Sequence, residues 1–183
     1  NPMVDALATS GLRAAARGLA RAVAEGEDLE ARTDMAYCSL MGGLSLANAK
    51  LGAVHGFAGP LGGVTGAPHG AICAALLRVV TRANIRALAE REPENPALAR
   101  YATAAEVLTG RRLDGTHAMV AEALDSWLEE LEEQLRLPGL AELGLPAADH
   151  DAVVEAAMKG SSMKGNPITL TREELAGILR DAA

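Results

Sequence analysis

The sequence predicts an all-α protein, built as a bundle of several helices, and three observations support this fold class. Only four of the 183 residues are aromatic (one Trp, two Tyr and one Phe), whereas β-sheets are enriched in aromatic and β-branched residues. Apolar residues recur every three or four positions along most of the chain, and no segment alternates as a strand would. With 49% apolar residues, the chain can bury the core of one domain, which we expect over residues 1–183.

The first helix is expected at residues 2 to about 24. Asn1 can cap its N-terminus, and Pro2 suits the first turn because a proline there removes no helical hydrogen bond. Apolar residues follow one face, and Arg13, Arg17 and Arg21 follow another. This division predicts an amphipathic helix whose apolar face packs inward.

A second helix is expected at residues 29 to about 51, after a break at Gly26 and Asp28. Its middle, YCSLMGGLSLANA (residues 37–49), is nearly uncharged on all sides. That pattern is typical of a buried helix, so we expect it at the centre of the bundle. Gly42 and Gly43 each cost about 1 kcal/mol relative to alanine inside a helix, and we expect another backbone to approach closely there.

Residues 52–70, GAVHGFAGPLGGVTGAPHG, interrupt the helical pattern with repeated glycines, two prolines and two histidines. The segment is too long for a plain turn, and glycine tolerates backbone angles that other residues avoid. We expect an irregular, glycine-rich connection that can fold back on itself.

Five further helices are expected after this connection. They cover residues 69–91, 97–108, 116–137, 149 or 151 to about 160, and a last segment that begins at Thr171. Thr171 and Glu174 have the spacing of a capping box. In the long helix at 116–137, the side chains expected to face inward are Met119, Leu124, Leu128, Leu131 and Leu135.

Charge and cysteine content argue against several classes of partner. The net charge is −7, and no basic tract exceeds short pairs such as Arg111-Arg112, which disfavours nucleic acid and anionic membranes. Cys38 and Cys73 form no CxxC motif, so we expect no disulfide framework and a cytoplasmic location. No apolar run has membrane-spanning length, and no signal peptide is visible. No strand, glycine-rich turn and helix follow one another, so a nucleotide-binding half is expected elsewhere.

His55 and His69 flank the glycine-rich segment and are the candidate metal ligands. Imidazole nitrogens suit Zn²⁺ and Fe²⁺, and each of these ions takes at least three protein ligands. The two histidines are 14 positions apart, so they meet only if the segment folds back. No third ligand is obvious nearby, and spacing alone favours two unrelated histidines.

Three segments carry a resemblance to a known family. NPMVDALA, NAKLGAVHGFAGPLGGVTGAPHGAICAALL and SSMKGNPITLTREELAGIL occur in that order. They resemble the C-terminal helical domain of the iron-containing (group III) alcohol dehydrogenases, which belong to the dehydroquinate synthase-like superfamily. The resemblance extends from Asn1 to about Leu179.

The resemblance implies a metal-dependent dehydrogenase that transfers hydride between an NAD(P) cofactor and an alcohol, aldehyde or ketone. His55 and His69 match two family ligands of Fe²⁺ or Zn²⁺. The other two, an Asp and a His spaced D-x-x-x-H, precede the segment that matches Asn1-Pro2 in the family, as does the Rossmann-like N-terminal domain that binds most of NAD(P)H. We therefore expect residues 1–183 to form the metal-binding, substrate-side domain. We expect that, isolated from the nucleotide-binding domain, it is inactive and self-associates, and that the enzyme is a homo-oligomer acting on a small alcohol or aldehyde.

The resemblance also implies residues near the substrate, although it assigns no catalytic residue. Gly59 stands where many relatives carry another histidine, and Ser162 matches a position near the substrate pocket, with a loop hydroxyl as the alternative. Phe57 is expected as core or as cleft lining. Two other functions stay open: a maleylacetate-reductase-like enzyme, whose paired histidines AVHGFAG lacks, and a stand-alone helical module for binding or assembly.

Overall fold

The computed structural model describes residues 1–183 and contains helices but no strand, so the all-α prediction is confirmed. The α-helices are α1 (Pro2–Ala24), α2 (Leu29–Asn48), α3 (Ala53–Thr65), α4 (His69–Arg91), α5 (Pro96–Thr109), α6 (His117–Leu135), α7 (His150–Lys159) and α8 (Arg172–Asp181), with the short 3₁₀ helices η1 (Ala147–Asp149) and η2 (Ser161–Gly165) on either side of α7. The chain divides into two compact units. Residues 1–49 and 93–135 form the first unit, and residues 50–92 and 136–183 form the second.

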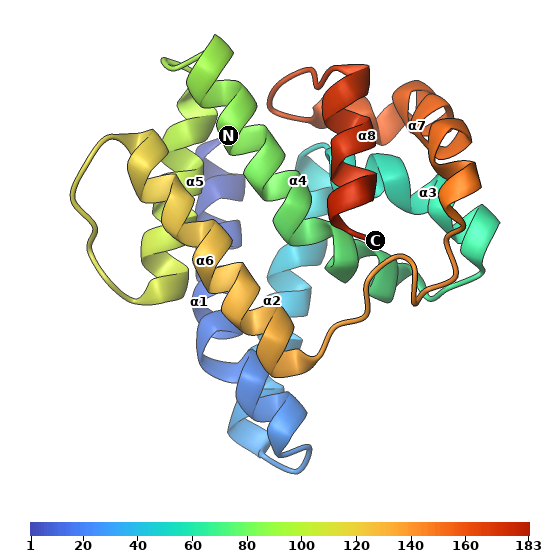
Figure 1. Ribbon diagram of the computed structural model, residues 1–183. Coiled ribbons are helices and arrows are strands. Elements are labelled where there is room, and N and C mark those ends of the chain that lie inside the picture. The colour runs from blue at the N-terminus through green and yellow to red at the C-terminus, as the bar shows by residue number, and fades with distance from the viewer. The chain divides into compact units, whose positions relative to one another are not determined.

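In the first unit, α1 and α2 form a helical hairpin (Figure 1). Asn1 begins α1 as predicted, because its side-chain Oδ1 accepts the Val4 N–H at 3.0 Å. The two helices pack closely at Gly18, where a Cβ atom would stand 2.7 Å from the Asp34 Cβ. Beside it, Arg17 forms an ion pair with Asp34 at 2.6 Å. Close packing at Gly18 and the Arg17–Asp34 ion pair therefore hold the two helices of this hairpin together.

The prediction that the second helix is central and buried is wrong. Within its unit, α2 packs only against α1, and its buried residues are Ala31 and Met41. All four leucines of this helix are 42–78% exposed: Leu29, Leu40, Leu44 and Leu46. A Cβ atom at Gly42 or Gly43 would meet nothing within 4 Å, so no backbone approaches there either. The apolar pattern extends round the helix, but this chain covers only one side of it.

Helices α5 and α6 complete the first unit with a small core. Ala102 and Ala105 on α5 pack with Val120, Leu124 and Leu128 on α6. Leu124 and Leu128 were predicted to face inward, and their burial confirms it. Met119 was expected on the same face, but it is 61% exposed. It lies in the first turn of α6, where Val120 and Ala121 take the inward positions instead.

The predicted irregular connection at 52–70 is also wrong, because residues 53–65 form the helix α3. Ala53, Phe57 and Leu61 repeat at intervals of four and are all buried, so packing of one helix face outweighs the low helix propensity of glycine. Within the predicted segment, only Gly52 and residues 66–68 are irregular. Gly66, with φ of 67°, adopts the left-handed conformation that ends helices, and α4 begins at His69 as predicted.

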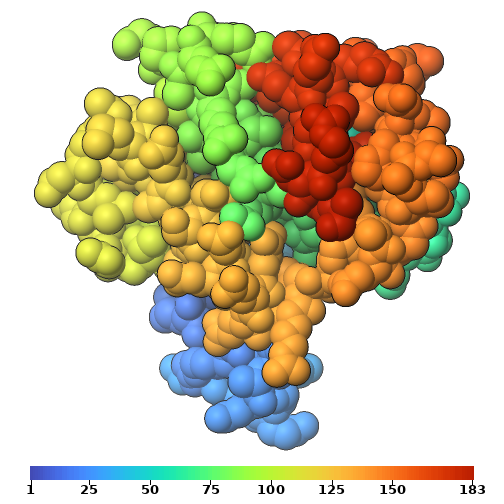
Figure 2. Space-filling view, viewed as in Figure 1, coloured from blue at the N-terminus to red at the C-terminus, as the bar shows by residue number.

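In the second unit, α8 lies against α4 (Figure 2, red against green). Arg82 on α4 forms an ion pair with Asp181 on α8 at 2.7 Å. The predicted capping box at the start of α8 is present: the Thr171 hydroxyl accepts the Glu174 N–H, and the Glu174 carboxylate accepts the Thr171 N–H. Glu174 also pairs with Arg91 at 3.1 Å, which ties the same cap to the end of α4.

Candidate metal centre

The structure brings His55 and His69 together. His55 lies in the first turn of α3, and His69 is the first residue of α4. Their ring centroids are 5.4 Å apart, and the rings are tilted by 49°. His55 is half-buried and His69 is exposed, so the pair stands at the surface of the second unit, where an ion can reach it.

Helix geometry explains how residues so far apart in sequence can meet. The 10 residues from His55 to the end of α3 advance the chain by about 15 Å, at about 1.5 Å per residue. The four steps from Thr65 to His69 can return at most about 13–14 Å. Because the two rings are neighbours, the short connection must run back along α3. The fold-back expected from the glycines therefore occurs, but through three residues rather than through a long loop.

A third possible ligand, Cys73, completes the cluster. Its Sγ lies 3.4 Å from the His69 Nε2, and the donor atoms of His55, His69 and Cys73 all lie within 4.8 Å of one another. The sequence analysis predicted no metal-binding role for Cys73, because it forms no CxxC motif with Cys38. The signal that could have found it is the spacing of four from His69, which puts both side chains on one face of α4.

The donor set suits a divalent ion such as Fe²⁺ or Zn²⁺. Imidazole nitrogen and thiolate sulfur are both ligands of such ions, and neutral imidazole is the form that binds. Burial, with a smaller contribution from the charge of His69, lowers the pKa of His55 below its ordinary value. Burial also raises the pKa of the Cys73 thiol. The His55 imidazole is therefore in the neutral form that binds a metal ion at neutral pH.

We expect His55 to take up its proton only at a pH below its ordinary value of 6.5 in the metal-free protein. As the pH falls through this range, the unfolded chain binds the proton before the folded chain does, so the folded state loses stability with falling pH. NMR titration of the His55 ring protons, assigned with His55→Gln, measures the midpoint. A midpoint at or above 6.5 would contradict the prediction.

The start of α3, two residues before His55, is held by a side chain from a distant segment. Gly52 precedes the helix and offers no side chain to cap it. The Asn166 Oδ1 accepts the Ala53 N–H at 3.0 Å instead. Asn166 also exchanges hydrogen bonds with the buried Asn84, donating at 2.7 Å and accepting at 3.2 Å, and donates to the Ile168 carbonyl oxygen at 2.8 Å. This network fixes the helix that carries His55.

The residues expected near a substrate have different surroundings. Phe57 is completely buried, which fits the core interpretation and leaves it no open surface. Gly59 is exposed, with nothing within 4 Å of a Cβ placed there. Ser162 lies half-buried in η2. A substrate role for Gly59 and Ser162 stays a prediction.

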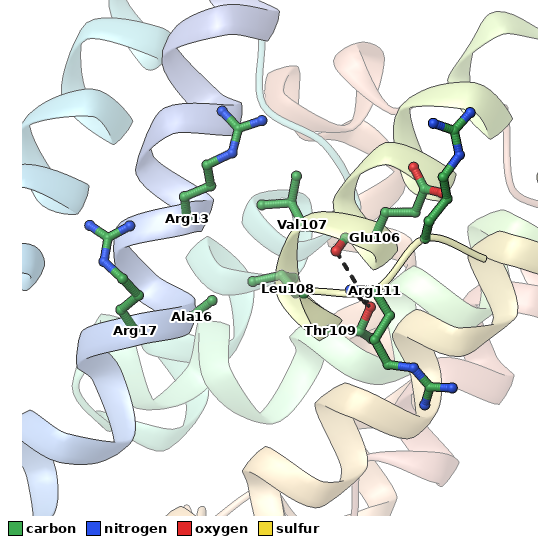
Figure 3. Close-up of a pocket in the computed structure, with 10 residues that line it drawn as sticks. Arg13, Ala16, Arg17, Glu106, Val107, Leu108, Thr109 and Arg111 are labelled. Atoms are coloured by element: carbon green, nitrogen blue, oxygen red, sulfur yellow. Dashed lines mark hydrogen bonds between the residues drawn. The ribbon is translucent and has the colours of Figure 1, made fainter.

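A larger surface cavity of about 690 Å³ lies in the first unit and contains none of these residues. It opens between α1 and the end of α5 (Figure 3). Arg13 and Arg17 project from α1, and Arg111 is directed away from them on the opposite side (Figure 3). Arg17 is already paired with Asp34. The polar side chains that line this cavity do not converge on one point, so the histidine cluster is the better candidate site.

Comparisons with known proteins agree with the fold. The sequence matches the Fe-containing alcohol dehydrogenase family, C-terminal region, over residues 1–183. The 1,3-propanediol dehydrogenase of Citrobacter freundii is 38% identical over 184 residues, which cover all of this chain and 45% of that protein. Alcohol dehydrogenase 4 of Schizosaccharomyces pombe is 37% identical over 183 residues, which cover all of this chain and 40% of that protein. A solved alcohol dehydrogenase from Oenococcus oeni superimposes with a TM-score of 0.88 at 31% identity, over all of this chain and 46% of that one.

The chain thus spans less than half of the length of these relatives. None of its helices is long and apolar enough to cross a membrane.

Proposed function

Because the chain belongs to the Fe-containing alcohol dehydrogenase family, we propose that it is the metal-binding, substrate-side domain of an NAD(P)-dependent dehydrogenase that interconverts alcohols with aldehydes or ketones. The observation that carries the proposal is the meeting of His55 and His69, 14 positions apart in sequence, at a ring-centroid distance of 5.4 Å. Two unrelated histidines have no reason to meet.

In this proposal, His55 and His69 hold the metal through their ring nitrogens. A bound Fe²⁺ or Zn²⁺ supplies Lewis-acid polarisation of the substrate oxygen. The nicotinamide supplies the hydride chemistry. The chain's own contribution is to orient the two imidazoles, which α3 and α4 present from their first turns.

Space for a substrate is open beside His55. Gly59 lies one helical turn after His55 on α3, and so on the same face. A Cβ atom at that position would meet nothing within 4 Å. We propose that this opening receives the small alcohol or aldehyde, and that Ser162 borders it.

The exposed apolar face of α2 supports the proposal of a covering partner. All four leucines on α2 are 42–78% exposed, and such patches are typical of interaction surfaces. The relatives are more than twice as long as this chain. We propose that a nucleotide-binding domain, of the kind found N-terminal in the family, or a second subunit of a homo-oligomer covers this face. The nucleotide-binding region would also supply the remaining metal ligands.

The test is to remove the metal and its ligands one at a time. The assayed enzyme contains this domain together with its nucleotide-binding domain, because the domain alone is expected to be inactive. Stripping this enzyme with a chelator is expected to abolish NAD(P)-linked turnover of short alcohols, and Fe²⁺ or Zn²⁺ is expected to restore it. His69→Ala is expected to lower metal affinity and turnover by about 100-fold or more. His117→Ala, in the first unit, is the matched control and should change neither.

Three outcomes would contradict the proposal. Full turnover by His69→Ala would remove His69 from the metal centre. Absence of metal and of turnover in the unaltered enzyme would favour the stand-alone binding module. Reduction of maleylacetate in preference to simple aldehydes would favour the related reductase.

A further inference from the structure

Cys73 has no role in the two-histidine site proposed above, yet its sulfur lies among the same donor atoms. Its Sγ is 3.4 Å from the His69 Nε2. It is a free thiol, and it is half-buried rather than sealed in the core. Cys38, the other free cysteine, lies on α2 in the first unit and belongs to no such cluster.

The distance from the Cys73 Sγ to the His69 Nε2 matches the separation of two ligand atoms on one metal ion. Zinc–sulfur bonds of about 2.3 Å and zinc–nitrogen bonds of about 2.0–2.1 Å, at a tetrahedral angle, hold the two ligand atoms about 3.5 Å apart. The observed 3.4 Å agrees with this value. The donor atoms of His55, His69 and Cys73 all lie within 4.8 Å of one another, which is close enough for the three to be considered ligands of one ion.

The position of Cys73 on α4 also favours ligation. Residues four apart on a helix project to the same side, and pairs of metal ligands use this spacing. His69 and Cys73 have it, in the first two turns of α4. His55 adds a third donor from a different helix, so the three donors approach from two directions.

We propose that Cys73 is a third protein ligand of the metal held by His55 and His69, an inference that rests on the metal site of the proposed function. On binding, the thiol releases its proton to solvent and a sulfur–metal bond forms. Thiolate is a soft ligand, so its presence favours Zn²⁺ and Co²⁺ over Mg²⁺, Ca²⁺ or Mn²⁺.

The decisive experiment titrates the metal-free enzyme with Co²⁺ and records its absorption spectrum. A thiolate ligand gives an intense sulfur-to-cobalt charge-transfer band in the near ultraviolet, whereas nitrogen and oxygen ligands give only weak visible bands. We expect the intense band in the unaltered enzyme and its complete loss in Cys73→Ser. Co²⁺ should still bind to that variant, at least about tenfold more weakly. Cys38→Ser is the matched control and should keep the band.

Each outcome decides between the possibilities. Weak visible bands without the ultraviolet band would overturn ligation by Cys73 and leave the histidine site intact; the sulfur would then only hydrogen-bond to His69. No cobalt spectrum at all would overturn this inference and the proposed metal centre together. Because the spectrum of the unaltered enzyme is itself decisive, a folding defect in Cys73→Ser would not obscure the result.

Discussion

Replacing Gly165 with alanine is expected to lower the free energy of unfolding by about 3 kcal/mol or more. A Cβ atom at this position would overlap the Leu51 carbonyl oxygen and stand 2.6 Å from the Lys50 Cβ. The obstacle is backbone, which cannot rotate away as the end of a flexible side chain can. The two segments are also held together by a hydrogen bond: the side chain of Asn166, next to Gly165, accepts the Ala53 N–H, two residues beyond Leu51, at 3.0 Å.

Gly63→Ala is the matched control for this change. Gly63 is in the same unit and inside α3, but nothing lies within 4 Å of a Cβ placed there. Alanine is favoured over glycine inside a helix by about 1 kcal/mol, so this variant is expected to be more stable than the unaltered protein. Urea unfolding followed by circular dichroism measures the free energy of unfolding of both variants. Equal midpoints for Gly165→Ala and the unaltered protein would show that the two segments separate at little cost.

Local signals in the sequence predicted the helix boundaries well. Asn1, Pro2 and the Thr171–Glu174 capping box act within a few residues, and the structure has α1 and α8 begin where they indicate. Burial of α2 could not be predicted in the same way. Its apolar pattern reports what the helix prefers to contact, but whether a partner covers each face depends on the rest of the fold.

The candidate site could likewise be predicted only in part, because local sequence patterns do not report contacts between distant segments. The resemblance identified His55 and His69, whereas their spacing in sequence argued against a meeting. Glycine propensity predicted a loop at 53–65, but the buried side chains of Ala53, Phe57 and Leu61 outweigh it. Asn166 caps a helix that begins 113 positions earlier in the chain, and no local pattern can reveal a contact over that distance.

Asn166→Ala is expected to lower the free energy of unfolding by about 3 kcal/mol, because it removes the cap of α3 and leaves polar groups buried without this partner. The Ala53 N–H loses its acceptor, and Asn84, only 3% exposed, loses both hydrogen bonds to Asn166. Since His55 lies two residues beyond Ala53, we also expect weaker metal binding. Urea unfolding and titration with Zn²⁺ measure the two effects.

The matched control for this change is Asn95→Ala, which removes a cap of the same chemistry from α5 in the first unit. Its Oδ1 accepts the Ala97 N–H at 2.9 Å, so its loss is expected to cost about 1 kcal/mol and to leave metal affinity unchanged. Asn166 and Asn84 act as one network, so the double variant Asn84→Ala/Asn166→Ala should lose less stability than the sum of the two single variants. Strict additivity would mean that Asn84 and Asn166 act independently. Unchanged Zn²⁺ affinity in Asn166→Ala would mean that α3 holds His55 in place without this distant cap. Loss of affinity in Asn166→Ala but not in Asn95→Ala would instead establish that Asn166, far from the histidines in sequence, sets the geometry of the metal centre.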